Sequence, residues 1–81
     1  MPYPHSFIKL TPEEKKIVSY KLSQYSQQGR YKQRRRLRVL WLSDMGLTFD
    51  QIARQTNFSF VWVRKLIYLY KKEGLTPFIR D

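Results

Sequence analysis

A dense basic run occupies residues 30–38. In a helix, Arg30, Arg34 and Arg38 share one face at four-residue spacing, and Arg35 and Lys32 form a neighbouring strip. Cations in such rows fit the phosphates of a nucleic acid, contacts that position a protein without reading sequence. About six contacts predict that the logarithm of affinity falls with log salt at a slope near −5. The alternative is a solvated basic face.

A second candidate set lies between residues 59 and 70. Helical periodicity directs one group inward: Val63, Leu66, Ile67 and Tyr70. The residues left for an external ligand are Ser59, Phe60, Val61, Arg64, Lys65 and Tyr68. Arg64 is the best candidate for reading a base, because a guanidinium matches the paired acceptors of guanine in a major groove. We expect Lys65 and Tyr68 to meet phosphates, and Lys71 and Lys72 either to do the same or to be solvated.

Three large apolar side chains at positions 60–62 admit several interpretations. Phe60, Val61 and Trp62 can contact thymine methyl groups, an apolar form of base recognition. Phe60 and Trp62 can instead form an exposed patch for a protein partner or for self-association. We favour the partner interpretation for Phe60 and expect Trp62 to fold back into the core.

Neither catalysis nor metal binding has a candidate constellation. The six acidic residues sit mainly at expected helix ends, where they cap helices and compensate dipoles. There is no cysteine, and His5 has no companion ligands. We therefore expect no enzyme activity, no metal, no cofactor and no small-molecule substrate.

The overall charge points to a polyanionic partner. Lys and Arg number 16 against 6 Asp and Glu, giving a formal charge of +10. Double-stranded DNA is the leading candidate and an anionic membrane surface the second. No apolar run approaches the roughly 20 residues of a spanning helix, and the N-terminus lacks the features of a signal peptide. We expect a cytoplasmic, nucleoid-associated protein.

The elements that must position these residues are all helices. We expect an N-terminal arm over 1–10, a domain over 11–75, and a tail over 76–81 in which Pro77 discourages further helix. The four helices are expected at about 12–28, 30–45, 49–56 and 60–73. Thr11 and Thr48 each begin a capping box, and glycines follow three of the helices. No segment alternates like a strand, so the fold class is all-α.

The spacing around residue 53 predicts a helix-turn-helix. Ala53 is the small residue where two helices meet, and Asn57 tolerates the left-handed turn four positions later. Val63 and Leu66 then face the core from the second helix. Thr56 is the exception, because an apolar side chain is commoner there. A plain helical hairpin is the alternative.

Beyond this spacing, several short stretches are similar to a known family. They are 10–14 (LTPEE), 36–42 (RLRVLWL), 45–48 (MGLT), 51–56 (QIARQT), 58–59 (FS) and 70–75 (YKKEGL). From Leu10 to Asp81 the chain resembles the N-terminal DNA-binding domain of mariner-like bacterial insertion-sequence transposases, a homeodomain-like module. The resemblance implies a four-helix homeodomain-like fold with residues 60–73 as the recognition helix. The apolar 60–63 (FVWV) departs from the polar or basic start usual in that family.

Three functions follow as hypotheses. The first is a DNA-binding module, either a transposase-like transcription regulator or a transposase targeting unit without its catalytic domain. The second is a protein-interaction module that uses Phe60 and Trp62. The third is an RNA binder that uses the arginine-rich helix. An arm with Tyr3, His5 and Phe7 in a minor groove is a lesser expectation.

Overall fold

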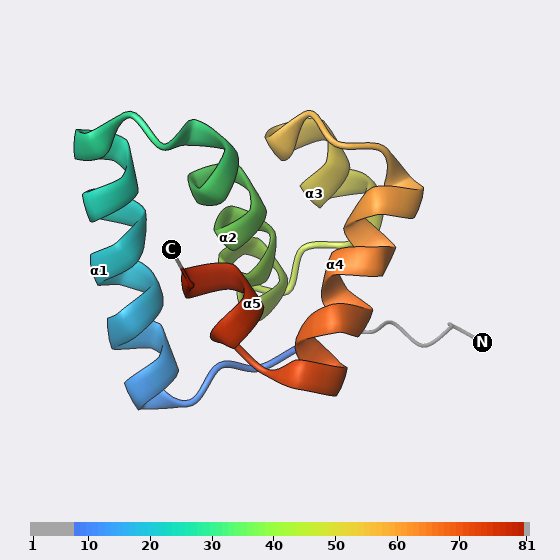
Figure 1. Ribbon diagram of the computed structural model, residues 1–81. Helices are drawn as coiled ribbons and strands as arrows, with labels where there is room; N and C mark the ends of the chain where they lie inside the picture. The colour runs from blue at the N-terminus through green and yellow to red at the C-terminus, as the bar shows by residue number, and fades with distance from the viewer. Residues whose placement is uncertain (1–7, 81) are drawn as a thin grey trace.

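The structure is a computed structural model that describes residues 8–80. Over that range every regular element is a helix (Figure 1). The helices are α1 (Pro12–Gln28), α2 (Tyr31–Asp44), α3 (Phe49–Thr56), α4 (Phe60–Glu73) and α5 (Thr76–Ile79). The all-α fold class is therefore confirmed.

Two helices begin with the capping boxes that the sequence predicts. At α1 the Thr11 hydroxyl accepts from the Glu14 backbone N–H at 3.1 Å, and Glu14 Oε1 accepts from the Thr11 N–H at 3.0 Å. At α3 the corresponding distances between Thr48 and Gln51 are 3.2 and 2.9 Å. These reciprocal bonds satisfy backbone donors that have no partner within their helix.

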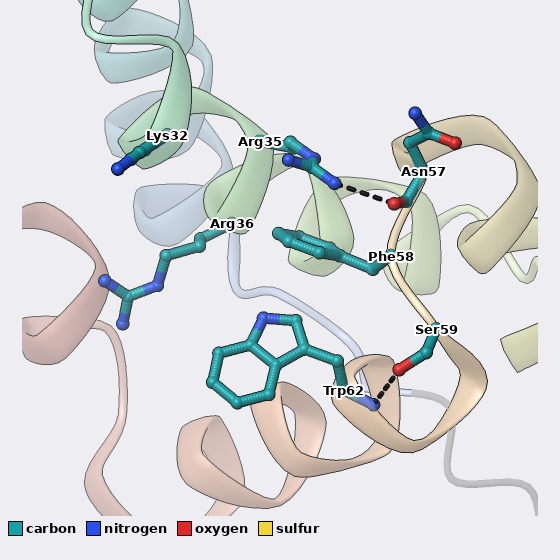
Figure 2. Close-up of a pocket in the computed structure, with 7 residues that line it drawn as sticks. All are labelled: Lys32, Arg35, Arg36, Asn57, Phe58, Ser59 and Trp62. Carbon is teal, nitrogen blue, oxygen red and sulfur yellow. Dashed lines mark hydrogen bonds between the residues drawn. The ribbon is translucent and has the colours of Figure 1, made fainter.

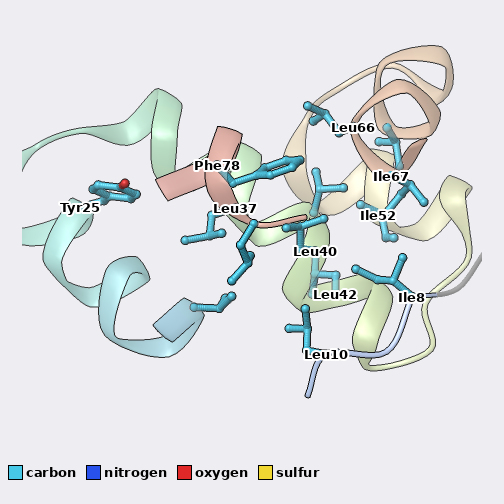
Figure 3. Packing of buried hydrophobic residues seen from close by; sticks show 14 residues of the cluster. Ile8, Leu10, Tyr25, Leu37, Leu40, Leu42, Ile52, Leu66, Ile67 and Phe78 are labelled. Carbon is cyan, nitrogen blue, oxygen red and sulfur yellow. The ribbon is translucent and has the colours of Figure 1, made fainter. Parts of the chain in front are cut away.

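Helix α2 is the centre of the molecule. It lies between α1 on one side and α3 and α4 on the other, and α5 crosses it (Figure 1). Its apolar side chains therefore point in several directions, and Leu37, Val39 and Leu40 are fully buried. They meet Val18 and Tyr25 of α1, Ile52 of α3 and Leu66 and Ile67 of α4 in one core (Figure 3).

The C-terminal segment differs from the expected tail, and the expected four-helix count is wrong. Residues Thr76–Ile79 form α5, with Pro77 in its first turn. Proline is tolerated there because the first turn needs no backbone donor from that residue. Phe78 is only 2% exposed and packs in the core, which gives the short helix its reason to form.

The end of the expected N-terminal arm also belongs to the core. Ile8 and Leu10 are buried, and their backbone N–H groups donate to the Ser43 hydroxyl at 3.2 Å and to Asp44 Oδ1 at 2.8 Å. Asp44 thus anchors the entry to α1 rather than only balancing a helix dipole. Tyr3, His5 and Phe7, the residues of the proposed minor-groove arm, lie outside the described residues.

Candidate nucleic-acid interface

A tight turn joins α3 to α4 in the geometry of a helix-turn-helix. Asn57 has φ 66°, in the left-handed region, and its N–H donates to the Ala53 carbonyl at 2.8 Å. The Ser59 hydroxyl then caps α4 by accepting from the Trp62 N–H at 3.1 Å. Thr56 fills its usually apolar slot without an unmet donor, because its buried hydroxyl donates to the Ile52 carbonyl at 2.7 Å.

Helix α4 buries one face and presents the other to solvent. Val63, Leu66 and Ile67 are buried, as the periodicity predicts. Each of the six residues expected at the ligand-facing side is exposed: Ser59, Phe60, Val61, Arg64, Lys65 and Tyr68. Positions 61, 65 and 68 follow one another along the helix at spacings of four and three, with Arg64 beside them. They form an outward face of mixed cationic, aromatic and apolar character.

Phe60 and Trp62 do not form a single patch. Positions two apart in a helix point in nearly opposite directions. Phe60 meets Phe49 of α3 edge to face, with ring centroids 5.5 Å apart. Trp62 meets Phe58 of the turn, with centroids 6.3 Å apart, and stays 42% exposed. The expected core position of Trp62 is therefore not observed.

Two of the candidate phosphate ligands on α2 make bonds inside the protein. Arg35 Nε donates to the Thr56 carbonyl at 2.6 Å, and its Nη2 donates to the Asn57 carbonyl at 2.7 Å. Arg38 Nη1 lies 3.4 Å from the Gln55 carbonyl. These carbonyls belong to the end of α3, which has no helical partners for them and carries the negative end of the helix dipole. The sequence reasoning missed this role.

The remaining basic residues of α2 are placed differently from one another. Arg34 is half-buried, and Arg30 is exposed at the N-cap of α2. Trp41 is also half-buried. It lies on the same side of α2, one turn after Arg38 and two turns after Arg34. The basic face therefore borders Trp41.

A hollow of about 540 Å³ opens between α2, the turn and the start of α4 (Figure 2). Its lining residues are Lys32, Arg35, Arg36, Asn57, Phe58, Ser59 and Trp62. The Arg35 guanidinium stacks over the Phe58 ring at 4.1 Å, and the Arg36 guanidinium lies 5.8 Å from the centroid of Phe78. No sequence signal singled out this hollow, because its residues come from three separate segments.

A hydrogen bond joins the later part of α4 to the start of α1. The Tyr70 hydroxyl donates to Glu14 Oε1 at 2.7 Å. Burial, with a further contribution from Glu14, raises the pKa of Tyr70 to about 12.

Within residues 8–80 no group of acidic and histidine side chains is placed to hold a metal ion. Nor is any helix in that range long and apolar enough to cross a membrane.

Residues 30–79 match the model of the homeodomain-like domain family. This match covers more than half of the chain, from the start of α2 to the end of α5, and the chain belongs to that family. Membership supports the helix-turn-helix described above and indicates DNA as the partner. No curated protein and no solved structure matches the chain.

Proposed function

We propose that the protein binds double-stranded DNA by placing the outward face of α4 in the major groove. The main support is a combination of two features. The turn between α3 and α4 has helix-turn-helix geometry, and a row of side chains on α4 is exposed to solvent. Val61, Arg64, Lys65 and Tyr68 face outward there, while the other side of α4 is held in the core. A helix held in this way is the element that such domains insert into a major groove.

Each outward residue has a role that its chemistry suggests. Arg64 donates to the two acceptors of a guanine, and Val61 contacts a thymine methyl group. Lys65 and Tyr68 bind phosphates and fix the register of the helix along the groove. Ser59 and Phe60 lie at the groove entrance, where Phe60 is held by Phe49.

The basic residues of α2 divide into two groups in this proposal. Arg30 and Arg34 contribute phosphate contacts beside the groove. Arg35 and Arg38 act chiefly through the turn, because their guanidinium groups hold the last carbonyls of α3.

We further propose that the protein is a transposase-like targeting module or regulator that works at the nucleoid and has no catalytic activity of its own. The support is the resemblance of its motifs to the DNA-binding domain of mariner-like transposases. RNA binding through α2 is the less favoured function, because Arg35 and Arg38 bond within the protein.

The test begins with selection of a preferred site from a pool of random-sequence duplexes. Binding of Arg64→Ala to that site is then compared with wild type by fluorescence anisotropy. We expect a loss of about 5- to 150-fold, the range for one bidentate base contact. Lys16→Ala removes the same charge from an exposed position on α1 and serves as the matched control.

Two results would contradict the proposal. One is an absence of duplex binding at about 50 mM salt, where phosphate contacts are strongest. The other is displacement of the duplex by structured RNA at equal concentration, which would favour the RNA-binding function. Equal losses for Arg64→Ala and Lys16→Ala would remove the base-reading role of Arg64.

A further inference from the structure

The hollow beside the first turn of α4 lies on a different flank from the outward face. Trp62, which lines it, points about a third of a turn away from Val61 and nearly opposite to Arg64 around the helix. One wall is cationic and comes from α2, with Lys32, Arg35 and Arg36 (Figure 2). The other wall is aromatic and comes from the turn and α4, with Phe58 and Trp62. A ligand that fills it must carry an anion next to an apolar surface.

Arg36 carries a hydrogen-bond donor that the described part of the protein does not use. Its Nε is buried and has no hydrogen-bond partner among residues 8–80. Its guanidinium is braced from behind by Phe78 of α5, at 5.8 Å from the ring centroid. A buried donor without an acceptor costs free energy, so a small shift of the Arg36 side chain that brings this donor to a ligand acceptor is favoured. Arg35, by contrast, already holds two carbonyls.

Trp62 supplies a surface on which a planar group can stack. Its side chain remains 42% exposed, although it lies in the first turn of α4 and its ring contacts the ring of Phe58. The Lys65 ammonium lies 5.9 Å from its ring centroid and adds positive charge at the rim. Aromatic rings beside a basic groove are the surfaces on which unpaired bases stack, and every base has a face that fits them.

We propose that this hollow binds one unpaired nucleotide of single-stranded DNA, with its base on Trp62 and its phosphate on Arg36 and Lys32. The volume of about 540 Å³ lies within the usual range of roughly 300–1,000 Å³ for small-ligand sites. A base inside a duplex is already stacked and paired, so only an unpaired or extruded nucleotide enters. The inference shares nucleic acid as the ligand with the proposed function, but its main contacts, Trp62, Arg36 and Lys32, have no role there.

The experiment measures anisotropy of a labelled ten-nucleotide thymidine strand with the full chain. We expect Trp62→Ala to weaken binding of this strand by about tenfold. Trp62→Phe should retain most of the wild-type affinity, because an aromatic ring suffices for stacking. Arg36→Gln should weaken it by a similar factor. The selected duplex should bind all three variants within about twofold of wild type. Urea unfolding of each variant verifies that it is folded.

A second probe separates stacking from charge. A labelled ten-unit abasic deoxyribose phosphate strand carries the same backbone charge but has no bases. We expect it to bind wild type about as weakly as the thymidine strand binds Trp62→Ala. Quenching of Trp62 fluorescence by the thymidine strand in Trp41→Phe, where it is the only tryptophan, is the matching optical signal.

The outcomes distinguish this inference from the proposed function. Equal binding of the abasic and thymidine strands overturns the inference, as does an equal loss of duplex and single-strand binding in Trp62→Ala. Trp62-dependent binding of a labelled peptide of alternating Glu and Leu, without such dependence for the thymidine strand, overturns it in favour of an acidic protein partner. Loss of duplex binding alone, with the Trp62 dependence intact, removes only the proposed function.

Discussion

At the scale of single residues, Arg35 shows how one side chain can serve the fold within a cluster that looks like a binding surface. Its guanidinium bonds two carbonyls at the end of α3 and covers the Phe58 ring. Hydrogen bonds from a charged donor to the negative end of a helix are stronger than ordinary ones. Arg35 therefore fixes the turn that aims α4.

We expect Arg35→Ala to lower the free energy of unfolding by about 2 kcal/mol, since two charge-assisted hydrogen bonds are lost and the carbonyls are left at a half-covered site. Urea denaturation followed by circular dichroism measures the change. Arg34→Ala, one position away and without such bonds, should change it by less than about 0.5 kcal/mol. Equal effects of the two substitutions would contradict the assigned role.

Tyr70 gives the domain a dependence on alkaline pH. Its folded-state pKa of about 12 lies above the ordinary 10.0, so the protonated phenol is favoured by folding. The resulting stability is fully present below pH 10 and is lost as the pH rises through 12. Tyr70→Phe lacks this proton and should lose about 1 kcal/mol at neutral pH. The difference in melting temperature between the two proteins should shrink from pH 10 upward. A constant difference would contradict the titration of Tyr70.

At the scale of elements, α5 braces the centre of the molecule. It is only four residues long, and such a helix has little stability by itself. Phe78 supplies the stability by entering the core, and the Arg36 guanidinium lies over its ring. The segment thus connects the packing of the core to one wall of the hollow.

Phe78→Ala should therefore lower the free energy of unfolding by about 3 kcal/mol or more, the usual range for removal of a buried phenylalanine. Thermal and urea unfolding measure it. Arg80→Ala, just beyond the helix and exposed, is the control and should behave like wild type. A small effect of Phe78→Ala would show that α5 does not pack on the core in solution.

At the scale of the whole molecule, the formal charge of +10 is partly used inside the fold. Lys15 pairs with Asp44 at 3.5 Å, Lys9 donates to the Asp44 carbonyl, and two arginines of α2 hold the end of α3. The number of cations available to phosphates is therefore smaller than the sequence alone indicates.

This division changes the expected salt dependence of duplex binding. With Arg30, Arg34, Arg64 and Lys65 as the phosphate or base contacts, the slope of log affinity against log salt is expected near −4. Adding Arg35 and Arg38 to these four residues makes six contacts and gives an expected slope near −5. Titrations from about 50 to 300 mM salt measure it. A slope at or beyond −5 would return both arginines to the DNA surface.

Structural features that depend on neighbouring residues could be predicted from the sequence. Thr11 and Thr48 with their partners three residues later predict the helix starts, and Asn57 predicts the turn. The apolar period of α4 predicts the burial of Val63, Leu66 and Ile67, but not the exposure of Trp62. Each of these signals is local, because caps, turns and helical faces are set within a few residues of chain.

The composition of the core and the roles of the charged residues, by contrast, depend on contacts between distant segments. Proline at 77 indicated a tail, yet burial of Phe78 made a helix. Ile8 and Leu10 were expected in an N-terminal arm. In the structure their backbone N–H groups donate to Ser43 and Asp44, about 35 residues away, and both residues join the core. The partners of Arg35 and the walls of the hollow likewise come from distant segments. Such contacts depend on how the helices pack, which local patterns do not specify.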